Sequence, residues 1–267
     1  MIPVNIPRFA GNEKRYLAEC IDSGWISSEG PFVRRFEEGM AQLCRRRHAI
    51  AVSNGTAALE LAFHVLGLAP GDEVIVPSCT IISCAAAIVR AGAIPVPCDV
   101  DPGHWNMTPE AVLAAITPRT RALLVVHTYG MACDMEALGG VADAHGLTVI
   151  EDAAEAHGQS SHGRPCGGFG LLSTFSFYAN KHVAAGEGGM VLTDDDHLAE
   201  RCRSLRNLAF GREFRFRHDE LGWNYRLGNL QAAVAVAQLE RLAETIAAKQ
   251  AAARRYTAAF ADLASLQ

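Results

Sequence analysis

The sequence predicts an α/β protein with a mostly parallel sheet between helices, and three observations predict it. Short runs of β-branched and aliphatic residues alternate with helical patterns from residue 49 to residue 151. Parallel strands need such crossover helices, and strands covered on both faces read as nearly continuous apolar runs. Residues 227–260 contain almost no helix breaker and are rich in Ala, Leu, Glu and Gln. We therefore expect one α/β domain that ends in a single long helix.

Local patterns give each element in chain order. We expect strands at residues 49–52, 73–76, 94–98, 122–127 and 147–151. The helices between them are expected at residues 56–67, at 79–91, from Thr108 and Pro109 onward, and at 135–145. Proline is favoured at the first position of a helix, which supports the third of these. Two more strands, 174–177 and 190–193, flank a glycine-rich loop, and a helix at 198–207 follows.

Composition excludes several classes of protein. The chain has 267 residues, of which 49% are hydrophobic and 20% charged, as is usual for a globular protein. The net charge is −5 and the basic run at residues 45–48 is short, which argues against a nucleic-acid partner. No apolar run approaches the ~18 residues that span a bilayer, and the N-terminus lacks the pattern of a signal peptide. We expect a cytoplasmic protein with no membrane contact.

The cysteines do not indicate a metal site. There are eight, without any C-x-x-C pair or clustered histidine spacing. Zinc sites and disulfide frameworks both depend on such spacings. We expect no metal, and we interpret the cysteines as small buried hydrophobic residues.

Lys181 and Asp152 are the most informative pair in the chain. Lys181 lies on a small-residue turn within residues 176–189, and Asp152 ends the apolar run that opens residues 149–158. A lysine amine can form a Schiff base with an aldehyde, and a carboxylate can keep a pyridine nitrogen protonated. Either residue alone is a weak signal, because most lysines are solvated and strand-end acids often bind metal, ribose or water. Together they predict a site for pyridoxal 5′-phosphate (PLP) with both residues catalytic.

A second motif predicts a phosphate site. The sequence SNGTAAL, residues 53–59, follows a strand and opens a helix. The backbone N–H groups of Thr56 and Ala57 would then point out of a helix N-terminus, where the dipole favours an anion. The hydroxyl of Ser176 could add a bond. Taken alone, the motif is a weak signal, and a plain Asx or Ser/Thr helix cap explains it better than a phosphate site does.

The chain resembles the DegT/DnrJ/StrS family of PLP-dependent sugar aminotransferases, and within it the nucleotide-sugar 4-aminotransferases. Seven motifs that cover nearly all of the chain carry the resemblance. They are residues 11–33, SNGTAAL at 53–59, GDEVIVPS at 71–78, VHTYGMACDM at 126–135, EDAAEAHG at 151–158, the loop around Lys181, and GWNYRLGNLQAA at 222–233.

The resemblance implies a role for each matching residue. Lys181 is expected to bind the cofactor aldehyde and to carry the proton that moves between carbon atoms, and Asp152 to face the ring nitrogen. Glu155 is expected near the ring hydroxyl. The remaining cofactor contacts are expected from Gly55, Thr56, Ala57, Ile81, Ser176 and, reaching over from a neighbouring subunit, Asn224. The sugar nucleotide is expected near Trp25, Ile26, Ser27 and Ser28.

Two features depart from the family pattern. Ile81 stands where many relatives have an aromatic residue over the pyridine ring, so stacking worth ~1 kcal/mol is expected to be lost. The family also continues past the long helix into a small C-terminal domain, which we expect this chain to lack. The implied fold is the large domain of an aspartate-aminotransferase-like, fold type I enzyme. We expect an N-terminal segment at the substrate site (1–35), the PLP domain (36–225) and the long helix (226–267).

The resemblance implies ping-pong transamination. Glutamate would donate the amino group, and a nucleotide-linked 4-keto-6-deoxyhexose would accept it, in the synthesis of an amino-sugar or O-antigen-type polysaccharide. The expected assembly is a homodimer with shared active sites.

Three alternatives remain beside the aminotransferase. The first is a PLP-dependent sugar dehydratase, which has histidine in place of the lysine and so turns attention to His182. The second is a non-catalytic sensor or assembly protein with the same fold. The third, a dinucleotide-binding oxidoreductase, lacks its G-x-G-x-x-G motif after the first strand.

Overall fold

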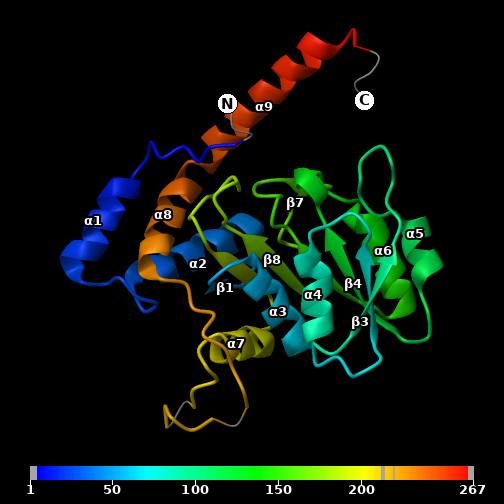
Figure 1. The fold of residues 1–267 in the computed structure, drawn as a ribbon, viewed down its shortest axis with the longest axis horizontal. Helices are drawn as coiled ribbons and strands as arrows, with labels where there is room; N and C mark the ends of the chain where they lie inside the picture. The colour runs from blue at the N-terminus through cyan, green and yellow to red at the C-terminus, as the bar shows by residue number, and fades with distance from the viewer. Residues whose placement is uncertain (1–4, 212–213, 219, 264–267) are drawn as a thin grey trace.

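The computed structural model describes residues 5–211, 214–218 and 220–263 (Figure 1). The helices are α1 Glu13–Ser23, α2 Pro31–Cys44, α3 Gly55–Leu66, α4 Ile82–Arg90, α5 Pro109–Ala115, α6 Met135–His145, α7 Asp196–Leu205, α8 Asn229–Glu240 and α9 Leu242–Phe260, with a 3₁₀ turn η1 at Thr128–Gly130. The strands are β1 His48–Val52, β2 Glu73–Pro77, β3 Ile94–Cys98, β4 Thr120–Val126, β5 Thr148–Asp152, β6 Ser160–Ser161, β7 Arg164–Pro165, β8 Leu172–Ser176 and β9 Gly189–Thr193.

The central sheet has seven strands in the order β1-β9-β8-β5-β4-β2-β3, and β6 pairs with β7 in a small separate ribbon. Strand β9 runs antiparallel to both of its neighbours, and the other central strands share one direction. The predicted mostly parallel sheet is therefore confirmed. The carboxyl ends of β2, β4, β5 and β8 meet at one edge, the edge at which ligands bind in open α/β sheets.

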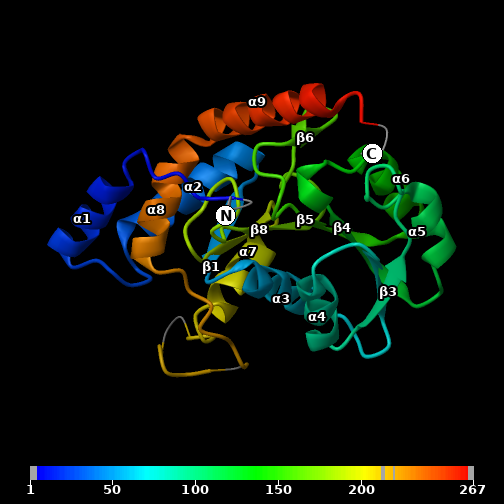
Figure 2. The same cartoon turned by 45° about the horizontal axis from the view of Figure 1, so that its top comes forward.

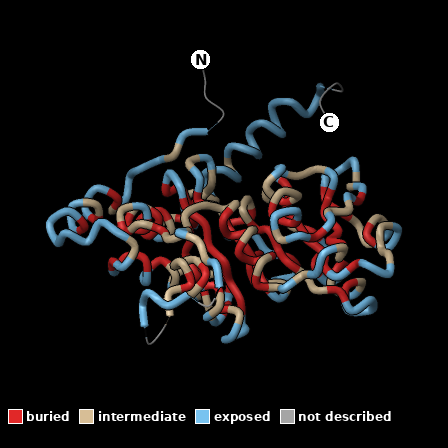
Figure 3. Tube along the Cα trace, turned by 60° about the horizontal axis from the view of Figure 1, so that its bottom comes forward, coloured by how far each residue is buried: buried red, intermediate tan, exposed pale blue. Residues whose placement is uncertain are grey.

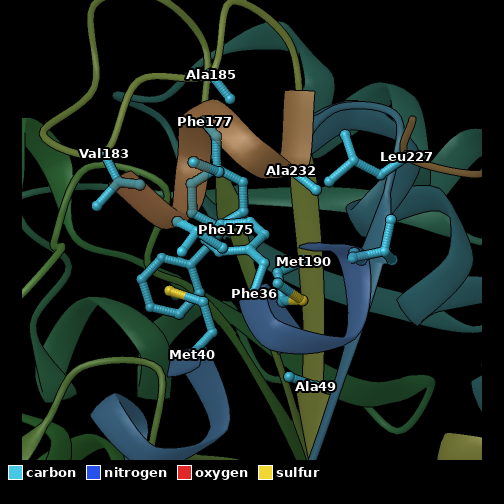
Figure 4. Packing of buried hydrophobic residues seen from close by; sticks show 14 of the residues in the cluster. Phe36, Met40, Ala49, Phe175, Phe177, Val183, Ala185, Met190, Leu227 and Ala232 are labelled. Atoms are coloured by element: carbon cyan, nitrogen blue, oxygen red, sulfur yellow. The ribbon is translucent and has the colours of Figure 1, made fainter. Parts of the chain in front are cut away.

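Alternate residues of the strands feed two apolar cores. On one face, Phe36 and Met40 of α2 pack with Phe175, Phe177 and Met190, and α8 adds its alanines (Figure 4). On the other face, α3, α4 and α7 cover Val52, Val76 and Val191. The buried segments run through the middle of the molecule, whereas α9 stays exposed along most of its length (Figure 3).

The predicted single long helix is wrong, because the structure has two helices that meet at Arg241. The backbone of Arg241 leaves the helical region at φ −110° and ψ 11°. Helix α8 packs against α1 and α2, while α9 runs away from both of them (Figure 2). The break lets Leu242 and Ile246 of α9 lie over Gly158, where a Cβ would collide with Ile246. Helical periodicity alone does not reveal this bend, since the residues on both sides are good helix formers.

The N-terminal segment is tied to α8 through Asn229. Its buried side chain accepts a hydrogen bond from the N–H of Phe32 at 2.9 Å and donates one to the carbonyl of Trp25 at 2.7 Å. The expected domain boundary after residue 35 lies inside α2, which packs on both β1 and α8. The segment is therefore part of the same packed unit as the sheet.

Within the described residues, no helix combines the length and the apolar character needed to cross a bilayer.

Phe36 tests the larger core. It is fully buried and meets Phe177 edge to face at 4.6 Å between ring centroids. Phe36→Ala should lower the free energy of unfolding by about 3–5 kcal/mol, because the lost ring leaves a cavity. Urea denaturation followed by circular dichroism measures this. Leu113→Ala, at a half-exposed position of α5, is the control and should cost under about 1 kcal/mol. Equal effects of the two substitutions would contradict the assignment of this core.

Candidate active site

A cavity of about 830 Å³ opens at the carboxyl ends of the parallel strands. Its walls come from the start of α3, the segment before α4, the end of β5, the η1 turn and the loop between β8 and β9. Most of the predicted site residues line it together: Gly55, Thr56, Ala57, Ile81, Asp152, Glu155, Ser176 and Lys181. A volume of this size is typical of cofactor and small-molecule sites.

Asp152 forms the buried floor of this cavity. Its side chain ends β5 and the residue is only 3% exposed. Burial raises the pKa of Asp152, while the hydrogen bonds from the N–H of Ala154 and the thiol of Cys84 and the positive charge of Lys181 act in the opposite direction. A carboxylate held in this way can accept a hydrogen bond from a protonated ring nitrogen.

Lys181 reaches the same cavity from the loop between β8 and β9. A turn positions it, in which the N–H of Lys181 donates to the carbonyl of Tyr178 at 2.9 Å. Its side chain is 16% exposed, and Nζ donates to Oε1 of Glu155 at 2.8 Å. The other oxygen of Glu155 accepts from the N–H of Tyr129 at 2.9 Å. Glu155 thus fixes the amine at the cavity wall and joins the lysine loop to the η1 turn.

The N-terminus of α3 offers free N–H donors. Gly55 lies so close to β8 that a Cβ there would stand 2.7 Å from Cβ of Ser176, so glycine is required. Within the described part of the chain, the N–H groups of Gly55 and Thr56 have no hydrogen-bond partner. The hydroxyl of Thr56 pairs with that of Ser83 at 2.9 Å. This corner presents N–H groups and hydroxyls to one point of the cavity, as an anion requires.

Ala57 does not supply the free N–H that the sequence predicts. Its N–H donates to Oδ1 of Asn54 at 2.8 Å, so Asn54 caps α3. The two interpretations of SNGTAAL therefore hold together: Asn54 satisfies one orphan donor of the helix, and the two preceding N–H groups stay open. Ala57 lines the cavity but contributes no backbone donor to it.

Five predicted residues lie outside this cavity. Trp25, Ile26 and Ser27 are exposed, Ser28 is half-exposed, and all four belong to the segment that leads into α2. Asn224 is exposed too, and its Oδ1 accepts from Nε of Arg226 at 2.9 Å. The structure does not bring them to the cavity of their own chain, and their roles stay predictions.

His127 and Glu151 form a buried pair behind the cavity. Nδ1 of His127 accepts from the N–H of Cys133 at 3.1 Å, so Nε2 carries the proton and donates to Glu151 at 2.9 Å. The Glu151 carboxylate also accepts from the N–H groups of Gly167 and Phe169. Cys166 brings its sulfur to the same cluster. Because the histidine and carboxylate atoms are already hydrogen-bonded, we interpret this group as a network that orients His127.

His182 points away from the cavity that its neighbour Lys181 lines. Its Nδ1 lies 3.5 Å from the carbonyl of His157. His157 is stacked on Phe175 and Phe177, and burial lowers its pKa to about 3. Among the described residues, Nε2 of His157 has no hydrogen-bond partner. Lys181 rather than His182 therefore faces the cavity, which disfavours the dehydratase alternative.

Sequence reasoning missed several residues of the site. Ser83, Cys84, His127 and Tyr129 all lie at or directly behind the cavity wall. Tyr129 is 84% exposed and adopts the left-handed φ of 52°, which is rare for a bulky residue. The one sequence signal for this conformation of Tyr129 is the glycine that follows it, Gly130.

The residues present fit PLP. The N–H groups of Gly55 and Thr56 would hold a phosphate, Asp152 would face a ring nitrogen, and Lys181 has a primary amine within the same cavity. These are the three groups that a PLP enzyme uses to bind and activate its cofactor.

Comparisons with known proteins agree with this geometry. Residues 7–267 match the family model described as the DegT/DnrJ/EryC1/StrS aminotransferase family. A protein named GDP-perosamine synthase from Caulobacter vibrioides is 48% identical over 93% of this chain and 67% of its own length. The protein of the same name from Vibrio cholerae is 45% identical over 98% of this chain and 72% of its own length.

The solved structures give the same result. The crystal structure of S. venezuelae DesV in complex with a ketimine intermediate superimposes with a TM-score of 0.89 at 43% identity, over 94% of this chain and 67% of that one. This chain therefore belongs to the DegT/DnrJ/EryC1/StrS aminotransferase family of fold type I, PLP-dependent enzymes.

Proposed function

We propose that the chain aminates the keto carbon of a nucleotide-linked 4-keto-6-deoxy sugar, with glutamate as amino donor. One observation carries the proposal: Lys181, Asp152 and the open N–H groups of α3 line a single cavity. The names of the relatives support the substrate class, and GDP is our choice of nucleotide because two of them are named GDP-perosamine synthase. The product would enter an amino-sugar or O-antigen-type polysaccharide.

Each residue has a role in holding the cofactor. Gly55 and Thr56 bind the phosphate through their N–H groups, with the hydroxyls of Thr56 and Ser176 beside them. Asp152 accepts the ring N–H, and Ile81 covers part of the ring. When bound, PLP supplies an electron sink that lets an amino group pass from one carbon to another.

Lys181 and Glu155 handle the proton in this proposal. The contact of 2.8 Å between them lets Glu155 hold the lysine nitrogen in place while it carries a proton. Once the amine is free it can take a proton at Nζ and return it to another atom in the same cavity. Low exposure of the amine keeps bulk water away from this transfer.

We further propose a homodimer in which Asn224 serves the neighbouring subunit. Helix α4, beside the cavity, exposes Ile82 at 78% and Val89 at 58%, and Ile81 precedes them at 64%. Phe216 and Leu221, from the segment that contains Asn224, are more than 80% exposed. Such an apolar surface beside a ligand site favours a partner, and a two-fold axis lets one segment serve the other subunit.

Two finer assignments belong to the same proposal. Trp25, Ile26, Ser27 and Ser28 contact the sugar nucleotide, since Trp25 and Ile26 are half-exposed apolar side chains in the N-terminal segment 1–35. The protein works in the cytoplasm, because its eight cysteines are all free thiols, as a reducing compartment would keep them.

Lys181→Ala tests the proposal directly. The parent with PLP should show a visible band that borohydride removes, and mass spectrometry should find the label on Lys181, because among the described residues this is the amine that lines the cavity. The variant should lose the band and the amination of a GDP-linked 4-keto-6-deoxyhexose. Lys249→Ala, at an exposed position, is the control and should keep both. A variant that aminates the sugar at the parent rate would refute the role of Lys181.

Asp152→Asn should separate function from stability. Turnover should fall by about 10²–10³-fold, because the ring nitrogen loses its charged partner. Without PLP the variant should be more stable than the parent at pH 8. The folded parent keeps the proton of Asp152 to higher pH than the unfolded chain does, because burial raises the folded-state pKa. The parent therefore loses stability as the pH rises from the unfolded-state pKa to the folded-state pKa, whereas asparagine does not titrate. Urea midpoints measured between pH 4 and pH 8 check this, and an advantage that grows towards acid pH would contradict it.

Mixed dimers test the shared site. Lys181→Ala and Asn224→Asp should each be nearly inactive, the second because a carboxylate repels the cofactor phosphate. Co-expression should restore about one quarter of the parent activity, since half of the dimers are mixed and each mixed dimer has one complete site. Mixed dimers purified with two tags that are no more active than the single variants would exclude sharing.

A further inference from the structure

The two oxygens of Asp152 have different partners on the protein side. Oδ1 accepts a hydrogen bond from the N–H of Ala154 at 3.0 Å. Oδ2 accepts one from the thiol of Cys84 at 3.4 Å. Cys84 is fully buried in the first turn of α4, and its sulfur lies 3.2 Å from the hydroxyl of Thr80. The contact therefore links two segments that lie far apart in the sequence.

The direction of these hydrogen bonds follows from the chemistry of the groups. An ionised carboxylate can only accept, so the proton between Cys84 and Asp152 belongs to the sulfur. The hydroxyl of Thr80 is then the donor to that sulfur. Burial, followed by the charge of Asp152, raises the pKa of the Cys84 thiol, so the thiol stays protonated and remains a donor. The result is a chain from Thr80 through Cys84 to Asp152.

We propose that Cys84 is a positioning residue that fixes the carboxylate of Asp152 and sets how strongly this carboxylate holds the ring of the cofactor. The inference rests on the proposed function, because it acts through the contact between Asp152 and the ring nitrogen. A thiol is a weaker donor than a hydroxyl, so Cys84 orients the carboxylate while neutralising little of its charge.

A buried cysteine is more often a small apolar residue, and the other cysteines support that interpretation. Cys133 donates to a backbone carbonyl, and Cys202, a residue of α7, packs in the apolar core between α7 and the sheet. Among the described residues, Cys84 is the cysteine whose thiol donates to a carboxylate of the cavity. This difference separates a positioning role from simple packing.

Cys84→Ala and Cys84→Ser test the inference as a pair, with Cys202→Ala as the control for loss of a buried thiol. Cys84→Ala should bind PLP about fivefold more weakly, as expected for the loss of one hydrogen bond of about 1 kcal/mol. Cys84→Ser should bind at least as tightly as the parent, because its hydroxyl can donate to Asp152. Cys202→Ala should change stability and leave PLP affinity unchanged.

A second measurement uses the protein without cofactor. The ¹³Cγ signal of Asp152, identified by its absence in Asp152→Asn, reports the titration of this carboxylate directly. Its midpoint should move to higher pH in Cys84→Ala, which lacks the donor, and to lower pH in Cys84→Ser, which has a stronger one. His127 and Lys181, the titratable groups that act on Asp152 in addition to Cys84, are unchanged in every variant.

The outcomes distinguish the inference from the proposed function. Opposite shifts for the alanine and serine variants support the positioning role. Parent-like PLP affinity and midpoint in Cys84→Ala, or the same shift in both variants, overturn it while the function stands. A parent that shows no borohydride-sensitive band with PLP overturns the function and this inference together.

Discussion

The burial of one carboxylate is the constraint around which this structure is arranged. Asp152 ends a central strand where water is excluded, and the ionised form is costly there. The N–H of Ala154, the thiol of Cys84 and the charge of Lys181 offset this cost in part. Each comes from a different segment, so the fold must bring these segments together before the carboxylate can be tolerated. The acceptor capacity of the carboxylate that these donors leave free faces the cavity, where a ring N–H can donate to it.

Close backbone contacts complete the site opposite Asp152. At Gly55 the start of α3 approaches Ser176, and Gly189 lies directly against the backbone of Asn54 and Gly55, so a side chain at either glycine would push the helix from the sheet. The capping amide of Asn54 then uses the N–H of Ala57 and leaves the two before it open. The proposed anion site depends on the absence of two Cβ atoms as much as on any polar group.

Helices and strands could be predicted from the sequence where local chemistry determines them. Helix α6 and strand β3 lie at the expected residues, because apolar periodicity and flanking glycines specify them. Asp152 and Lys181 could be found because a strand end and a glycine-rich loop are local features. Cys84 and Ser83 could not, since their roles arise from contacts with Asp152 and Thr56 across the fold. The bend at Arg241 depends likewise on how Gly158 meets α9.

The difference between local features and contacts across the fold also explains why Asn224 and Trp25 are the hardest residues to assign. Both were expected at the site by resemblance, and both are exposed and do not line the cavity of their own chain. The exposed Asn224, close to the exposed Leu221, adds little to the stability of a single subunit. It would have a function if a second copy covered α4 and if Asn224 then reached the free N–H groups of α3 in that copy. The cavity of a single chain would then be one wall of the complete site.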